Sequence, residues 1–252
     1  MFELKNIFVG YGKKQILNDI SLSFPKSKLT TVIGPNGSGK STLLKTAMGL
    51  ISPISGEVYI DGENTIGLAR RQLAEKAAYL SQGKNVPDMT VSQLVLHGRF
   101  PHLSYPRRYT EKDKKIVLNS LDELGISNLS NLPLSSLSGG MRQNAYIAMA
   151  LAQDADYILF DEPTAYLDIS HQLEFMKTLK KLTNNGKGIV AVLHDLPLAF
   201  AFSDSIVLLN DGNVAIEGTP QEIYKNPVIR KVFGVEIDYS KEDKSYRYKY
   251  GL

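Results

Sequence analysis

A glycine-rich segment at residues 34–41 carries the residue types that bind phosphate. It reads Gly-Pro-Asn-Gly-Ser-Gly-Lys-Ser and fits the pattern G-x-x-x-x-G-K-[ST]. Its glycines permit positive φ angles, so several backbone N–H groups can converge on one anion. Lys40 would reach the β- and γ-phosphates of a nucleoside triphosphate, and the Ser41 hydroxyl would bind Mg²⁺. An accidental glycine-rich turn is the alternative, but an apolar run before the segment and a helix-forming run after it favour a phosphate-binding loop.

Two adjacent acids follow the apolar run Tyr157–Phe160. Asp161 would hold Mg²⁺, and Glu162 would polarise the attacking water as a general base. In isolation such a pair is more often a strand end or a helix cap. Downstream of a phosphate-binding loop, the pair favours nucleotide hydrolysis.

A second anion site is predicted at Ser138, Gly139 and Gly140. These residues precede residues 141–152, which have the composition of a helix. The backbone N–H groups at a helix N-terminus point outward and favour anions. The alternative is an ordinary serine N-cap with loop glycines.

The elements that must position these residues alternate between strands and helices. The apolar runs 29–33, 155–160 and 188–193 are typical of buried parallel strands, and 169–183 reads as a helix between the last two. Strand-like segments open the chain, and 205–216 reads as a hairpin. Between residues 86 and 131 helical segments replace strands, with Thr90 as an N-cap, a helix start at 110–113 and Gly125 at a helix end. The pattern predicts an α/β core with a helical insertion.

Bulk composition narrows the function classes. The chain has 252 residues, 43% hydrophobic and 22% charged, and a net charge of +3. That charge is too small to indicate nucleic-acid binding. The chain has no cysteine, which excludes disulfides and thiol catalysis. We expect no signal peptide and no membrane span, and therefore a soluble, cytosolic chain that needs a partner for any role at a membrane.

Residues 137–143, Leu-Ser-Gly-Gly-Met-Arg-Gln, resemble the signature L-S-G-G-Q-x-Q of the ATP-binding cassette (ABC) family. The signature lies between the phosphate-binding loop and the acid pair, as in that family. The resemblance implies one ABC ATPase domain over 1–252, with a P-loop NTPase core of mostly parallel sheet and flanking helices. Its parts would be a core with an antiparallel β subdomain (about 1–85 and 153–235), a helical subdomain (about 86–152) and a C-terminal tail (236–252).

The resemblance also assigns roles to single residues. Tyr11 would stack on adenine, Gln82 would contact Mg²⁺ and the attacking water and link the site to the membrane partner, and His194 would sense the γ-phosphate. Asp168 lies in the loop that communicates across the dimer. His97, His102 and His171 are interpreted as structural. The expected ATP contacts are Tyr11, Gly34, Pro35, Asn36, Gly37, Ser38, Gly39, Lys40, Ser41, Thr42, Ser138, Gly139, Gly140 and Asp168. The expected catalytic residues are Glu162, His194 and Gln82, and the expected Mg²⁺ contacts are Ser41, Gln82 and Asp161.

In this family each ATP lies between the phosphate-binding loop of one subunit and the signature of the other. The resemblance therefore implies a homodimer, or pairing with a closely related subunit. Three residues depart from the usual pattern: Met141 replaces glutamine, Asn144 replaces a common arginine, and Tyr166 is bulky. These departures concern subunit coupling and turnover, because no phosphate, metal or base residue is lost.

Three classes of ABC protein compete: an importer subunit, an exporter subunit and a soluble protein of translation, repair or cluster assembly. The interval between Gln82 and Leu137 is too short for the coiled-coil arms of repair proteins. Residues 95–102 and 161–172 resemble the importers of ferric siderophores, haem and vitamin B12. That resemblance implies integral membrane permease subunits as partners, an extracytoplasmic solute-binding protein as an indirect partner, and a place on the cytoplasmic face of the membrane. For the tail at 241–250, an edge strand is favoured over nucleic-acid stacking.

Overall fold

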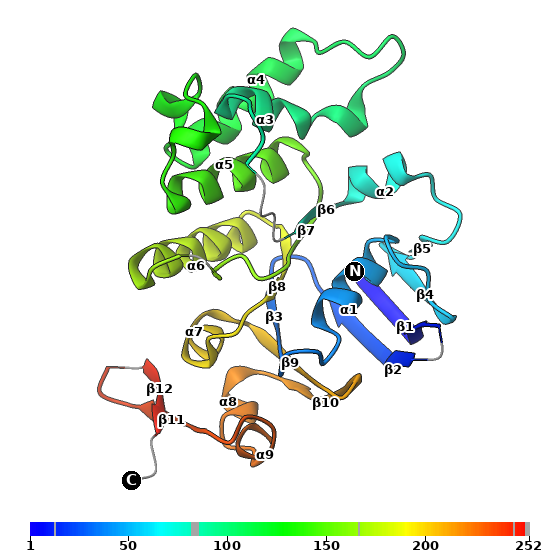
Figure 1. Cartoon of the computed structure of the whole chain (residues 1–252), viewed down its shortest axis with the longest axis vertical. Coiled ribbons are helices and arrows are strands. Elements are labelled where there is room, and N and C mark those ends of the chain that lie inside the picture. The colour runs from blue at the N-terminus through cyan, green and yellow to red at the C-terminus, as the bar shows by residue number, and fades with distance from the viewer. Residues whose placement is uncertain (13, 82–85, 166, 244, 250–252) are drawn as a thin grey trace.

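The computed structural model describes residues 1–12, 14–81, 86–165, 167–243 and 245–249 (Figure 1). A six-stranded sheet lies at its centre, in the order β10-β9-β3-β8-β7-β6. The strands are β3 (Leu29–Ile33), β6 (Ala77–Leu80), β7 (Tyr157–Phe160), β8 (Gly188–Val192), β9 (Ser205–Asn210) and β10 (Asn213–Gly218). All neighbours are parallel except the β9–β10 hairpin. The predicted α/β fold with a mostly parallel sheet is confirmed, although β7 begins at Tyr157 rather than Ala155.

Alternate residues of the central strands enter two different hydrophobic clusters. Tyr157 and Leu159 pack with α1 (Lys40–Ala47) and the antiparallel sheet. Ile158 and Phe160 pack with α6 (Ile169–Asn184) and α7 (Leu196–Phe202). Since successive side chains of a strand point to opposite faces, a strand buried on both sides must be apolar throughout. The continuous apolar runs in the sequence follow from this arrangement.

The second sheet is antiparallel, with the order β2-β1-β4-β5. Its strands are β1 (Phe2–Tyr11), β2 (Lys14–Phe24), β4 (Ser55–Ile60) and β5 (Glu63–Asn64). In β1 the residues Ile7 and Val9 are buried, whereas the alternate residues Phe8 and Gly10 are only partly so. One face of this sheet therefore covers α1, and the other faces outward.

A helical region gathers at one end of the molecule (Figure 1). It contains α3 (Val91–His97), α4 (Glu111–Glu123) and α5 (Gly139–Ala152), which share a separate hydrophobic cluster. The helix α2 (Arg70–Lys76) leads into β6. As predicted, Thr90 caps α3 and a helix starts within 110–113, where Thr110 is the cap of α4; Gly125, predicted at the helix end, has a positive φ after α4. Three short 3₁₀ turns complete the region: Phe100–His102, Ser127–Leu129 and Leu134–Ser136.

The opposite end of the molecule holds the C-terminal segment (Figure 1). Two short helices, α8 (Pro220–Ile223) and α9 (Val228–Phe233), precede a two-stranded sheet of β11 (Glu236–Ser240) and β12 (Ser245–Lys249). The tail is thus a strand, as predicted, but its partner is the preceding strand β11. Among the helices of the described residues, none combines the length and apolar character needed to cross a membrane.

Candidate functional site

The phosphate-binding loop joins β3 to α1. Gly34, Gly37 and Gly39 have φ angles of 156°, 80° and 104°, as the sequence predicts. Packing also requires glycine at position 34, because a Cβ there would lie 2.2 Å from the carbonyl oxygen of Leu209. The positive φ and the short distance to β9 therefore both require glycine at position 34. Thr42 follows in the first turn of α1.

Lys40 lies within the loop rather than projecting from it. Its side chain is almost fully buried, and its ammonium group donates to the carbonyl oxygens of Gly34 at 2.8 Å and Pro35 at 2.9 Å. Burial lowers the pKa of Lys40, while the nearby carboxylates of Glu162 and Asp161 act in the opposite direction. The ammonium group of Lys40 therefore lies inside the loop, bonded to two of its carbonyl oxygens.

Asp161 links Ser41, in the first turn of α1, to Tyr79 on the edge strand β6. One carboxylate oxygen accepts a hydrogen bond from the Ser41 hydroxyl at 2.8 Å, and the other accepts from the Tyr79 hydroxyl at 2.9 Å. Burial and the charge of Asp161 raise the pKa of Tyr79, so its hydroxyl stays a donor at neutral pH. The structure thus brings together two of the three residues that the sequence assigns to Mg²⁺, Ser41 and Asp161.

Glu162 directs its carboxylate to another strand. Its Oε1 lies 2.9 Å from Nε2 of His194, which follows the carboxyl end of β8. Glu162 also has a positive φ of 53°, which is uncommon for a residue with a side chain. Since β7 and β8 are adjacent and parallel, their ends deliver the acid pair and the histidine to the same edge of the sheet.

The second predicted anion site lies at the start of α5. Ser138 is the N-cap, and its hydroxyl accepts from the Met141 N–H, so Gly139 and Gly140 form the first turn. A Cβ on Gly140 would lie 2.1 Å from the ring of His171 on α6. The signature segment is therefore packed against α6.

Asp168 is the N-cap of α6 and binds the same histidine. Its Oδ1 accepts from the backbone N–H of His171 at 2.9 Å and lies 2.7 Å from His171 Nδ1. The backbone hydrogen bond from His171, with the Ser170 hydroxyl and the His171 ring, lowers the pKa of Asp168 to about 2. His171 thus joins the loop at Asp168 to the signature at Gly140.

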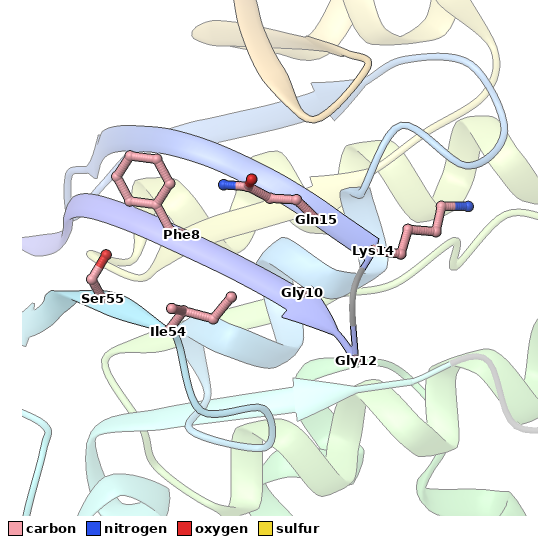
Figure 2. A pocket seen from close by; sticks show the side chains of 7 residues that line it. All are labelled: Phe8, Gly10, Gly12, Lys14, Gln15, Ile54 and Ser55. Atoms are coloured by element: carbon pink, nitrogen blue, oxygen red, sulfur yellow. The ribbon is translucent and has the colours of Figure 1, made fainter.

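Tyr11 ends β1 and is 55% exposed. A shallow pocket of about 320 Å³ lies beside it on the outward face of the antiparallel sheet (Figure 2). Its lining is Phe8, Gly10, Gly12, Lys14, Gln15, Ile54 and Ser55. Phe8 and Gly10 alternate with the buried Ile7 and Val9, so the pocket lies on the face of the sheet away from the core, and its lining includes no residue of the phosphate-binding loop. Gln82 lies outside the described residues.

The sequence does not predict two of the contacts at the site. The Tyr79–Asp161 bond joins neighbouring strands, and its only sequence signal is a tyrosine near the end of an apolar strand. The sequence indicates a structural role for His171, and its contact with Gly140 arises from the packing of α5 on α6, which no local pattern encodes. Both residues orient the predicted site residues rather than replace them.

Comparison with known proteins places this geometry in a family. The family model described as ABC transporter matches residues 17–165. The petrobactin import ATP-binding protein FpuD of Bacillus anthracis is 40% identical over 240 residues, covering 94% of this chain and 88% of that protein. The iron(3+)-hydroxamate import ATP-binding protein FhuC of Bacillus subtilis (strain 168) is 40% identical over 232 residues, covering 91% and 86%.

Solved structures share the fold. A nucleotide-free ATP-binding cassette of an ABC transporter superposes with a TM-score of 0.84 at 22% identity, over 92% of this chain and 98% of that one. A dimeric post-hydrolysis state of an ATP-binding cassette, bound to ADP and Pi, superposes with a TM-score of 0.74 at 32% identity, over 87% and 99%.

Proposed function

The chain belongs to the ABC transporter family, and we propose that it is the ATPase subunit that powers import of an iron–siderophore complex. Support comes from the relatives at 40% identity, whose names specify petrobactin and iron(3+)-hydroxamate import. Haem and cobalamin-type chelates are the related substrates that the sequence resemblance leaves open. Another type of ABC importer, or an ABC ATPase without a transport role, is the alternative function.

ATP would bind at the phosphate-binding loop, with its phosphates against the backbone N–H groups of residues 34–42. The helix N-terminus at Lys40 adds roughly half a positive charge there. The buried ammonium group of Lys40 is already aimed at the loop interior by its bonds to Gly34 and Pro35. Tyr11 would stack on adenine from the end of β1.

The residues near the loop fit Mg²⁺. In the described part of the chain, no group of three or more His, Cys, Asp or Glu side chains could hold a metal ion. Mg²⁺, however, is usually held by one or two protein oxygens together with substrate phosphates and water. The hydroxyl of Ser41 and the carboxylate of Asp161 are hard oxygen donors 2.8 Å apart, which fits such a shared site. The ion would supply charge neutralisation for the phosphates, and Gln82 would complete the set.

Hydrolysis would begin with a water molecule held by the Glu162 carboxylate. Glu162 accepts the proton as water attacks the γ-phosphorus, and the bond from that phosphorus to the β–γ bridging oxygen breaks. His194 at 2.9 Å holds the orientation of Glu162 and lies at the same edge of the sheet, where it can bond to the γ-phosphate. One observation supports this mechanism above all: the Asp161–Ser41 hydrogen bond and the Glu162–His194 contact lie at the same edge of the sheet, beside the loop.

The working unit would be a dimer, either of two copies of this chain or of this chain with a related ABC subunit. Ser138, Gly139 and Gly140 lie at the start of α5, where Gly140 packs against the ring of His171 on α6, and they would bind the ATP of the opposite subunit. Permease subunits in the membrane would dock this chain on the cytoplasmic face, and an extracytoplasmic solute-binding protein would deliver the substrate. Nucleic acid is not a partner in this proposal.

Substituting Glu162→Gln tests the mechanism. Loss of the general base should lower kcat by about 10²- to 10⁴-fold while ATP binding is retained, and the variant should accumulate as an ATP-bound dimer in size-exclusion chromatography. Glu174→Gln, an exposed position on α6, is the matched control and should keep the wild-type kcat. Turnover at the wild-type rate in Glu162→Gln would remove Glu162 from this role. For the transport step, the permease complex in vesicles should show ATP hydrolysis stimulated by a ferric siderophore on its binding protein, and stimulation by another solute alone would contradict iron import.

A further inference from the structure

The C-terminal hairpin β11–β12 lies outside the residues that the family model matches and carries a cluster of tyrosine rings. The ring of Tyr246 is only 9% exposed and lies 4.8 Å from Tyr239, 5.6 Å from Tyr224 and 5.4 Å from Phe200, measured between ring centroids. A two-stranded hairpin is at best marginally stable in water by itself. Its packing on Phe200, a residue of α7, therefore fixes its position.

The helix α7 shows what this packing does for the backbone. The first N–H groups of a helix have no partner within the helix. In α7 the N–H of Leu198 bonds to the Asp195 carboxylate at 2.7 Å, and Ala199 bonds to the Asp195 carbonyl. Pro197 has no N–H to satisfy. The remaining donor, the N–H of Leu196, bonds to the Tyr248 hydroxyl at 3.3 Å.

Leu196 is two residues from His194, which contacts Glu162 at 2.9 Å. The short connection 194–196 leaves the histidine little freedom once both ends are fixed. At one end it continues from β8, and at the other it enters α7, where the Asp195 cap and the Tyr248 bond hold the first turn. We propose that Tyr248 is a positioning residue that holds the turn at 194–196, and through it the His194 ring, in the orientation that serves ATP hydrolysis.

This inference rests on the proposed role of His194 in hydrolysis. Tyr248 would touch neither the nucleotide nor the reacting atoms, because it acts on the backbone of α7. Its loss should therefore leave ATP affinity unchanged and reduce the fraction of time that His194 is correctly placed. The C-terminal hairpin then belongs to the catalytic apparatus although it lies at the end of the molecule opposite the helical region (Figure 1).

Tyr248→Phe tests the proposal because it removes the hydroxyl and keeps the ring. Steady-state ATP hydrolysis by the full chain should show kcat lowered about three- to tenfold, the range expected from one lost neutral hydrogen bond, with KM for ATP unchanged. Tyr239→Phe removes a hydroxyl from the same hairpin and should keep the wild-type kcat. In a His194→Ala background Tyr248→Phe should add no further loss, because both changes act on one group.

Three results would overturn the proposal. They are an unchanged kcat in Tyr248→Phe, an equal loss in Tyr239→Phe, and a full additional loss in the His194→Ala background. If the unchanged kcat comes with a lowered melting temperature, Tyr248 stabilises the hairpin and does nothing more. If His194→Ala itself hydrolyses ATP at the wild-type rate, the premise about His194 fails, which is a different outcome from failure at Tyr248 alone.

Discussion

The hydroxyl of Tyr79 should be a measurable source of both stability and order at the phosphate site. It donates to Oδ2 of Asp161 at 2.9 Å from the neighbouring strand, while Ser41 occupies the other carboxylate oxygen. Substituting Tyr79→Phe removes this one hydrogen bond and keeps the ring. The Asp161 carboxylate would then be held from one side only.

The size of the effect follows from the charge and the burial of the pair. A hydrogen bond to a charged group contributes about 1.5–3 kcal/mol to stability. Asp161 is 6% exposed and Tyr79 is partly buried, so water cannot fully replace the lost donor. We expect Tyr79→Phe to lower the free energy of unfolding by about 1.5–2 kcal/mol. Since Asp161 is also a proposed Mg²⁺ residue, the Mg²⁺ concentration for half-maximal ATPase activity should rise.

Urea denaturation of the full chain measures the first quantity, and ATPase titration with Mg²⁺ measures the second. The matched control is Tyr59→Phe, because the Tyr59 hydroxyl donates to Glu57 at 2.8 Å on an exposed surface. That variant should unfold at the wild-type urea concentration. The reasoning is refuted if both variants lose equal stability, or if Tyr79→Phe loses none.

Two further changes test the helical region. The carboxylate of Asp113 forms a buried ion pair with Arg99 at 3.0 Å. Burial acts to raise the pKa of Asp113, but hydrogen bonds from Thr110 and Arg99 prevail and hold it at about 2, below the unfolded value of 3.8. Asp113→Asn should therefore remove about 2 kcal/mol of pH-dependent stability that is full above pH 5 and shrinks as pH falls towards 2; a pH-independent difference in urea denaturation would contradict it. Gly98→Ala places a Cβ 2.2 Å from the carbonyl oxygen of Met149, so we expect thermal denaturation to show a loss of about 1–3 kcal/mol, although the helical φ of −56° at Gly98 would by itself favour alanine. If Gly98→Ala instead stabilised the protein, α3 and α5 would have to move apart at little cost, and the argument from the short Cβ distance would be wrong.

Local chemistry explains which features were predictable. The positive φ angles at Gly34, Gly37 and Gly39 follow from a pattern that only glycine satisfies, and the helix starts at Thr90 and Thr110 follow from capping within four residues. Such features are encoded over a few positions. The central strands were likewise recognisable, because burial on both faces leaves an unbroken apolar run.

The unpredicted contacts all join residues that are distant in the chain. Tyr79 reaches Asp161 only because β6 and β7 pair in parallel, and Tyr248 reaches Leu196 only because β12 packs on α7. No local pattern distinguishes these tyrosines from ordinary strand residues. The subdomain boundaries and the nucleotide contacts remain predictions, since they concern groupings and ligands that the fold alone does not test.

The backbone at Glu162 separates the two halves of the site. Asp161 and Glu162 are adjacent, yet the first bonds to Ser41 and Tyr79 and the second to His194. An extended backbone would send successive side chains to opposite faces of the sheet. The strand β7 ends at Phe160, and Glu162 has a positive φ of 53° and lies beside His194, which follows β8. A left-handed conformation at a residue with a Cβ costs on the order of 1 kcal/mol, so the surrounding contacts must hold it. We infer that the left-handed conformation at Glu162 is retained because it would let the two neighbouring carboxylates serve different proposed partners: Asp161 the Mg²⁺ beside the loop, and Glu162 the attacking water together with His194.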